Sequence, residues 1–159
     1  MSILVEDGTI ITGANSYATT AYLETYAESM GEALTIDAEV LINKSALYVE
    51  SLNHKGRKLT KAQSMQYPRS GVVIDGFAVL TTEIPTLLKT LQCEVAIAIN
   101  AGNDPLSTID RAVKREKVGP IEIEYADNAA PFAYNRRITA LERQLVGGVD
   151  GGTFEVTRG

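Results

Sequence analysis

The chain has 159 residues, of which 45% are hydrophobic and 22% charged, and these values are typical of one globular domain. Because it holds one cysteine, Cys93, and one histidine, His54, the composition excludes an internal disulfide and a His/Cys metal site within a single chain. The longest strongly apolar stretch, residues 95–99, is too short to cross a bilayer, and the first residues lack the basic and apolar regions of a signal peptide. We therefore expect a protein of the cytosolic type.

The formal net charge of −5 is distributed in blocks along the chain. Residues 1–50 carry eight acidic residues and one basic residue, whereas residues 51–70 carry five basic residues and no acidic one. A second basic cluster at residues 111–117 is interrupted only by Glu116, and an acidic segment follows it. A basic block is typical of a phosphate-binding surface, of one half of a charge-complementary contact between copies, or of a solvated loop. The sequence leaves these alternatives open.

Apolar residues at helical spacing predict two helices in the first third of the chain. The first covers residues 17–30, with Asn15 and Ser16 as its N-cap and Gly31 at its end. The second begins after Asp37, a good capping residue, and follows one apolar face to Leu52. Residues 61–66 predict a further short turn of helix.

The middle of the chain predicts a hairpin and then the strongest helix. The hairpin covers residues 72–79, since Asp75-Gly76 suits a tight turn in which both central residues have positive φ. The helix opens near Pro85, is apolar on most sides and ends near residues 102–105, as expected for a helix at the centre of the core. Within it, Cys93 is expected to be a small buried residue.

The last third of the chain changes from helical to strand periodicity. Residues 118–126 alternate between apolar and acidic side chains and predict a half-buried strand, and a short amphipathic helix follows Pro131. Glycines then form a linker before residues 153–157, which belong either to a disordered tail or to an arm that adds a strand to another subunit.

The predicted fold class is mainly α. We expect a small helical bundle over residues 1–146, with a β-hairpin near 72–79 and one additional strand near 118–126. A glycine-rich linker and an extended C-terminal arm would occupy residues 147–159.

Signals of catalysis are weak. The chain has no glycine-rich phosphate loop, and Ser70-Gly71 lacks the flanking pattern of a nucleophile elbow. His54 lies in a basic stretch, where a surface position is expected rather than a general base, and Glu122 and Glu124 are expected to face outward from their strand. We therefore expect no enzymatic activity and no cofactor.

Single-stranded nucleic-acid binding needs basic groups for the backbone and aromatic rings for the bases. Residues 55–69 offer five basic side chains and one ring, Tyr67, and Arg115 is expected near Tyr125. A pI of about 4.9, the absence of tryptophan and an aromatic content of 6% weaken the electrostatic case for such binding.

Several motifs together resemble a known family. They are Tyr67-Pro68-Arg69-Ser70-Gly71-Val72, Asp75-Gly76 and Glu83-Ile84-Pro85, with further similarity at residues 5–9, 14–17, 48–57 and 117–126. In this order and spacing they resemble the small neck proteins of tailed bacteriophages that are labelled "DnaT-like single-stranded-DNA binding", which are related to head–tail connector or adaptor proteins. The resemblance covers roughly residues 5–146. Such relatives often have Trp where this chain has Tyr67.

The resemblance implies a structural protein of the virion neck, made in the host cytoplasm. Such an adaptor docks on the portal protein, forms a homo-oligomeric ring of twelve subunits that extends the DNA channel, and supplies a platform for the next neck or tail protein. Packaged DNA would pass through without sequence-specific binding, and no membrane is involved. Two alternatives are a replication-type single-stranded-DNA-binding protein and a tail-completion or terminator protein.

Two groups of candidate residues follow. Unpaired strand edges are natural templates for pairing between chains, so the candidate subunit or portal interface is Ile121, Ile123, Tyr125, Phe154 and Val156. The candidate DNA-facing or charge-complementary residues are Lys55, Arg57, Lys58, Lys61, Arg69, Lys114 and Arg115.

Overall fold

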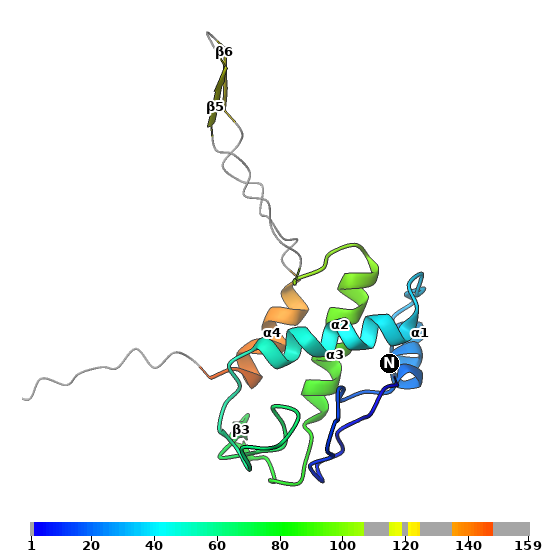
Figure 1. Cartoon of the computed structure of the whole chain (residues 1–159), viewed down its shortest axis with the longest axis vertical. Coiled ribbons are helices and arrows are strands. Elements are labelled where there is room, and N and C mark those ends of the chain that lie inside the picture. Colours follow the sequence, from blue (N-terminus) through cyan, green and yellow to red (C-terminus); the bar gives the residue numbers. More distant parts are fainter. Residues whose placement is uncertain (1, 107–114, 119–120, 125–134, 148–159) are drawn as a thin grey trace, which may run out of the picture.

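A computed structural model describes residues 2–106, 115–118, 121–124 and 135–147, with the side chains of 115–118 and 121–124 left out. Its described part is mainly helical, as predicted (Figure 1). The helices are α1 (Thr20–Ser29), α2 (Ala38–Ser51), α3 (Thr86–Asn100) and α4 (Arg136–Leu145). The strands are β1 (Arg57–Lys58), β2 (Arg69–Ser70), β3 (Val73–Ile74), β4 (Phe77–Ala78), β5 (Arg115–Val118) and β6 (Ile121–Glu124). They form three antiparallel pairs, β1–β2, β3–β4 and β5–β6.

The start of α1 differs from the prediction. Thr19, rather than Asn15 or Ser16, is the N-cap, and its side chain accepts a hydrogen bond from the amide of Tyr22. The two expected capping side chains are engaged elsewhere: Asn15 accepts from the amide of Leu4, and the hydroxyl of Ser16 donates to the carbonyl of Ala18. Residues 16–18 are therefore buried but not helical, and the helix begins after them.

The other predicted helices and the hairpin are confirmed. Asp37 caps α2 by accepting from the amides of Glu39 and Val40. Asp75 and Gly76 form the turn between β3 and β4 with φ of 50° and 83°. The helical turn predicted at residues 61–66 was wrong.

Helix α3 is the centre of the core and packs against α1, α2 and α4. Its buried residues include Leu88, Leu91 and Val95, as well as Cys93, whose predicted burial is confirmed. The polar Gln92 is also fully buried on this helix. It accepts from the amide of Tyr17 at 3.0 Å and donates to Ser16 Oγ at 2.8 Å and the carbonyl of Ile42 at 3.2 Å. One amide side chain thereby joins three segments of the fold.

The N-terminal loop is organised by a buried carboxylate. Glu6 is fully buried, and its two oxygens accept from the amides of Gly8, Ile10 and Ile11 at 2.8–3.0 Å. Gly8 has a φ of +107°, and a Cβ there would lie 2.1 Å from the carbonyl oxygen of Thr82. Only glycine fits this close approach of two backbones.

Helix α4 begins five residues after Pro131, with Asn135 as its N-cap. Its buried residues Ile138 and Leu145 face the core. Arg137 Nη2 lies 2.9 Å from Glu94 Oε1 of α3, and the hydroxyl of Tyr48 on α2 donates to Glu142. The last of the described helices is thus bound to both α3 and α2.

The strand predicted near residues 118–126 is present as β6, and its partner β5 was not predicted as a strand. The predicted C-terminal arm, residues 148–159, lies outside the described residues. None of the four described helices is both long and apolar enough to cross a membrane.

Candidate functional site

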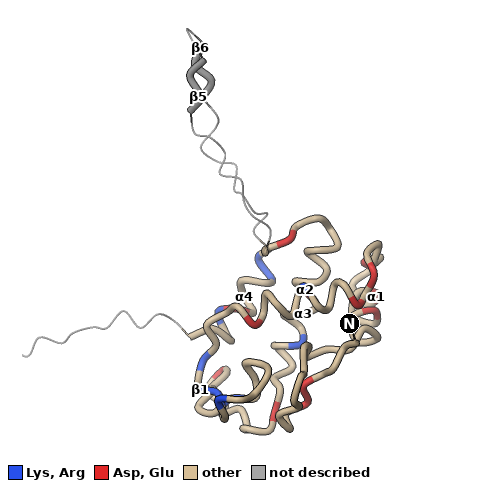
Figure 2. Tube along the Cα trace, in the orientation of Figure 1, with Lys and Arg blue, Asp and Glu red and all other residues tan. Residues whose placement is uncertain are grey.

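The basic residues of the first cluster lie in a lobe formed by residues 53–80, which we call the basic lobe. It contains β1 to β4 and follows α2 (Figures 1 and 2). Its loop has no helix or strand at residues 59–68, and the side chain of Gln63 binds the backbone groups there instead. It accepts from the amides of Leu59 and Thr60 and donates to the carbonyls of Met65 and Pro68. This explains why residues 61–66 do not form a helix.

Arg69 was expected to face DNA or a complementary charge, but the structure places it inside the lobe with 8% of its surface exposed. Its guanidinium donates to the carbonyls of Lys55 at 2.7 Å and Gly56 at 2.8 Å, and to Gln66 Oε1 at 2.8 Å. A longer bond reaches the carbonyl of His54 at 3.3 Å. Arginine suits this position because its five donors have a fixed planar geometry. The guanidinium of Arg69 therefore stabilises the lobe from inside and does not face a phosphate of DNA.

Lys55 also has a structural partner, since its Nζ donates to the carbonyl of Gln144 at 2.7 Å. That carbonyl belongs to the last turn of α4, where a cation is favourable because the helix dipole is negative there. The three remaining basic residues, Arg57, Lys58 and Lys61, are exposed. Of the five basic residues that were expected to face a partner, three are therefore exposed on the surface of the lobe.

A partly buried carboxylate, Glu50, joins the lobe to the helices. Glu50 accepts from the hydroxyl of Tyr17 and from the amide of Gln66 at 2.8 Å. Burial raises the pKa of Glu50, although these hydrogen bonds act in the opposite direction. Burial and the neighbouring Glu50 raise the pKa of Tyr17, whose oxygen accepts from the amide of Tyr67. These groups fasten the lobe to the helices, and sequence reasoning did not find them because no local pattern marks them.

His54 was expected at the surface, but only 4% of it is exposed. Its Nε2 lies 2.8 Å from the carbonyl of Val49, and its ring meets that of Tyr67 edge-on at 5.2 Å between centroids. Burial lowers the pKa of His54, so its neutral form is favoured. The ring of Tyr67 packs against His54, and Val146, just after α4, forms a β-bridge with it; the basic residues around His54 in the sequence give no sign of either contact.

The second basic cluster is described only in its backbone. The β5–β6 register places Arg115 opposite Glu124 and Lys117 opposite Glu122. Opposite charges across an antiparallel pair are a stabilising arrangement within the pair itself. Ile121 and Ile123 lie in β6, whereas Lys114, Tyr125, Phe154 and Val156 lie outside the described residues.

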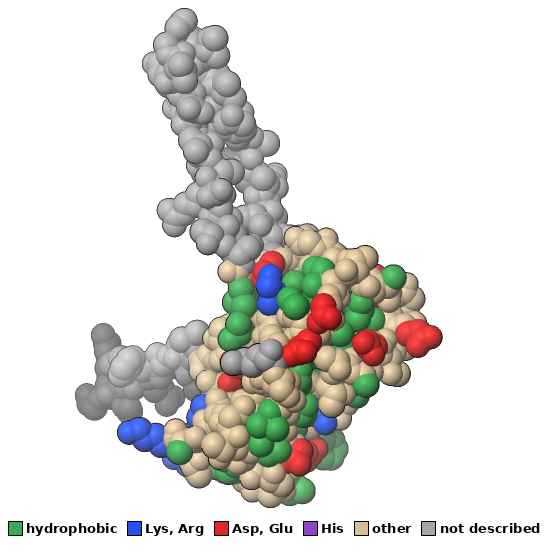
Figure 3. Space-filling view, turned by 45° about the vertical axis from the view of Figure 1, so that its right-hand side comes forward, with side chains coloured by type: hydrophobic (Ala, Val, Ile, Leu, Met, Phe, Trp, Pro, Cys, Tyr) green, Lys and Arg blue, Asp and Glu red, His purple; other side chains and the backbone are tan. Residues whose placement is uncertain are grey.

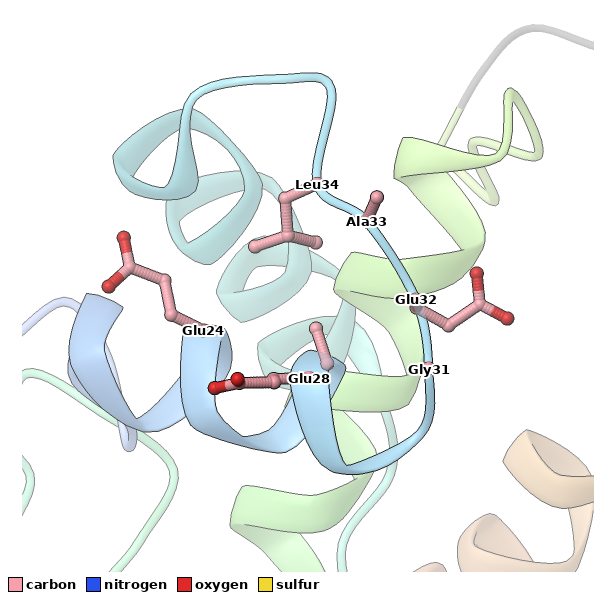
Figure 4. Close-up of a pocket in the computed structure, with 7 residues that line it drawn as sticks. Glu24, Glu28, Gly31, Glu32, Ala33 and Leu34 are labelled. Atoms are coloured by element: carbon pink, nitrogen blue, oxygen red, sulfur yellow. The ribbon is translucent and has the colours of Figure 1, made fainter.

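An acidic surface that sequence reasoning did not single out lies on α1 and the loop after it; we call it the acidic end. Glu24, Glu28 and Glu32 are exposed and line a hollow of about 370 Å³ with Leu34 and Ala33. Figure 4 shows Glu24 and Glu28 on successive turns of α1, while Glu32 points in another direction. The spacing of four residues between these acids was the signal that could have found the surface.

The charges are separated along the molecule. On the backbone trace, basic residues occur in the lobe around β1 and along α4, and acidic residues occur on the side of α1 and at other places on the helical body (Figure 2). Figure 3, which turns the α1 side forward, shows acidic side chains spread over that side, with basic ones at its lower left edge and a few others among the acidic ones. The sequence agrees, since no Lys or Arg occurs before Lys44. The basic lobe and the acidic end therefore carry opposite charge, although residues of both signs also lie on α2 and α4.

Nothing in the described part of the chain forms a metal centre, because no group of three or more His, Cys, Asp or Glu residues is close enough to hold an ion. Burial raises the pKa of the Cys93 thiol to about 12, so this thiol is protonated at neutral pH. What the described surface can do chemically is to make charge-dependent contacts.

Comparison with known proteins gives one match. Neither the curated proteins nor the solved structures contain a match to this sequence. A protein-family model matches residues 1–159, the whole length of the chain. The chain belongs to the family described as "Putative DnaT-like ssDNA binding protein".

Proposed function

We propose that this chain is a structural protein of a phage particle, a head–tail adaptor that docks on the portal and forms a ring with its own copies. The ring would extend the DNA channel and present a platform to the next neck or tail protein. The observation that carries the proposal is the separation of charge between the acidic end and the basic lobe. The portal as partner rests on the resemblance of the motifs around Tyr67 and Asp75 to small neck proteins.

Charge separation favours self-association in which the acidic end of one copy meets the basic lobe of the next. When unlike ends of identical chains meet, each contact is heterologous, and repetition produces a ring if the rotation closes. Opposite potentials also steer the two ends toward each other and set their register. A chain with one acidic and one basic end is therefore suited to repeated contact with itself.

The net charge and the internal partners of two basic residues favour a channel through which DNA passes over a surface that binds DNA tightly. The net charge is −5, and two of the five basic residues of the first cluster have internal partners, Arg69 in the lobe and Lys55 on α4. Strong binding to phosphates would oppose the passage of DNA through a channel.

Quantitative peptide mass spectrometry of particles purified from the phage that encodes the chain tests this proposal. A copy number close to that of the portal protein is the expected result. A ratio near one half would replace the adaptor by a tail-completion ring of lower symmetry, and absence from the particle would overturn a virion role altogether.

A second candidate is direct single-stranded-DNA binding, which the family description names. One observation favours it: Phe77, with 79% of its surface exposed, lies in the same lobe as the exposed Arg57 and Lys58. An exposed ring beside cations is the arrangement that stacks a base and holds its phosphate. Binding of an oligo(dT) to the full chain should then weaken with salt, with a log–log slope of roughly −0.7 per phosphate neutralised. If no salt-sensitive binding occurs at low ionic strength, this candidate fails.

A further inference from the structure

The chain that follows α2 and the chain that ends α4 are joined by backbone hydrogen bonds. The amide of Lys55 donates to the carbonyl of Leu145 at 3.0 Å, and the amide of Gly147 donates to the carbonyl of Asn53 at 2.9 Å. The Nζ of Lys55 adds a bond of 2.7 Å to the carbonyl of Gln144. We call the two joined segments the clasp, which consists of residues 53–55 and 145–147. The clasp holds the end of α4 against the start of the basic lobe.

His54 is the central residue of the clasp. It forms an antiparallel β-bridge with Val146, and 4% of its surface is exposed. Its Nε2 lies 2.8 Å from the carbonyl of Val49 on α2, and since a carbonyl oxygen can only accept, Nε2 carries the hydrogen. The neutral ring then has an acceptor at Nδ1, which is buried and has no hydrogen-bond partner among the described residues. One imidazole ring thus joins the clasp to α2.

A proton taken up by this ring would make Nδ1 a buried donor without an acceptor. The ring of Tyr67 meets the imidazole edge-on at 5.2 Å between centroids, and its hydroxyl makes no hydrogen bond in the described part of the chain. On β2, Arg69 Nη2 donates to the carbonyl of His54 at 3.3 Å, so a second cation would lie beside the guanidinium. Lys55 in the clasp and the exposed Arg143 of α4 add further positive charge. Burial and the charge of Arg69 both lower the pKa of His54, so the closed clasp contains the neutral ring.

The acidic residues on the helices packed against the clasp are bonded to other groups. On α2, Glu50 accepts from the hydroxyl of Tyr17 and from the amide of Gln66 at 2.8 Å. On α4, Glu142 accepts from the hydroxyl of Tyr48. Burial raises the pKa of Glu50, so its protonation in acid favours the buried state and does not open the fold. Among the described residues, an imidazolium at position 54 therefore has no carboxylate partner.

We propose that the clasp opens when His54 takes up a proton, so that residues 145–147 and the chain beyond them are released while the helical core stays folded. Opening moves the imidazolium into water and away from the neighbouring guanidinium. The start of α4 is held independently, because Arg137 forms an ion pair with Glu94 of α3 at 2.9 Å and Ile138 is buried. The attachment of the chain after α4 thereby depends on pH, and it requires neither a portal nor DNA.

Amide hydrogen exchange of the full chain, followed by NMR and corrected for the intrinsic effect of pH, tests this proposal. The reporters in the clasp are the amides of Lys55 and Gly147, and the reporter in the core is the amide of Val95 on α3. If the opened state has the ordinary histidine pKa of 6.5, the protection of the two clasp amides should fall by up to roughly 30-fold between pH 7.5 and pH 5. At pH 5, a low concentration of urea should leave the exchange of the clasp amides unchanged and speed that of Val95, because only global unfolding exposes a large surface.

Two variants separate the imidazole from the rest of the clasp. His54→Gln should remove the dependence of clasp protection on pH, because the titrating group is gone. The matched control is Lys55→Met, which removes the bond from Nζ to the carbonyl of Gln144 and keeps the histidine. This variant should lower the protection of the clasp amides at every pH and should retain the dependence on pH.

The wild-type chain provides a measurement that needs no variant to fold. His54 is the one histidine of the sequence, so its ring signals can be followed directly in an NMR titration. The ring should titrate below pH 6.5, and the protection of the clasp amides should stop falling near the midpoint of that titration. The inference is wrong if the ring titrates at its ordinary value, if His54→Gln keeps the dependence on pH, or if urea affects the clasp amides and Val95 equally.

Discussion

Replacing Arg69 by alanine should unfold the basic lobe far more readily than any surface change. The side chain is 8% exposed, and it donates short bonds to the carbonyls of Lys55 and Gly56 at 2.7 and 2.8 Å. Hydrogen bonds from a charged donor contribute about 1.5–3 kcal/mol each, and their loss leaves buried acceptors unpaired. These two bonds alone give an expected loss of about 3–6 kcal/mol in the free energy of unfolding.

Urea denaturation of the full chain measures this loss, with Arg57→Ala as the matched control. Arg57 is exposed and lies on the neighbouring strand, so its replacement should change the free energy of unfolding by at most about 0.5 kcal/mol. In a domain of this size, a loss of about 3 kcal/mol lowers the melting temperature by roughly 6–12 °C. If the two variants are equally stable, the guanidinium of Arg69 does not hold the lobe together and the reasoning is refuted.

Two further predictions concern the same lobe. Gly56→Ala should be clearly less stable than Gly76→Ala in urea, because a Cβ at Gly56 would lie 2.3 Å from the carbonyl oxygen of Ser70 while Gly76, also at positive φ, has open space; equal stabilities would contradict this close approach. Burial lowers the pKa of His54, so below its ordinary value of 6.5 the unfolded chain binds a proton that the folded chain does not, and stability falls as pH decreases, by at most about 1.4 kcal/mol per pH unit. The difference in unfolding free energy between wild type and His54→Gln should therefore change between about pH 7.5 and pH 5, and parallel profiles would show that His54 is not responsible.

Short sequence patterns correctly predicted those elements that are stabilised by residues close to one another in the sequence. Asp37 caps α2 and Asp75-Gly76 turns the hairpin, because each depends on residues within three positions in the sequence. The same signal failed at Ser16, where a contact with Gln92, 76 residues away, uses the side chain and α1 begins later. A capping residue predicts a helix start only where no distant partner competes for it.

The basic cluster shows why charge patterns predict a surface only in part. The five basic residues between 51 and 70 were candidates for facing DNA or a complementary charge, yet Arg69 and Lys55 donate to carbonyl groups of the protein. The acceptors for Lys55 lie on α4, almost ninety residues later, and no sequence spacing marks such a pair. His54 was misassigned because its burial depends on the ring of Tyr67 and on Val146 after α4, and no pattern around residue 54 marks either contact.

The dependence of the basic lobe on α4 has a consequence for the order of events during synthesis. The amide of Lys55 donates to the carbonyl of Leu145, and the amide of Gly147 donates to the carbonyl of Asn53. A ribosome adds roughly 5–20 residues per second, so residue 145 follows residue 55 by roughly 4–18 s. During this interval the residues of the β3–β4 hairpin have been synthesised, but α4, to which the lobe is hydrogen-bonded, is not yet complete. Synthesis of α4, rather than synthesis of the lobe itself, therefore sets the earliest moment at which this surface can engage a partner in its final form.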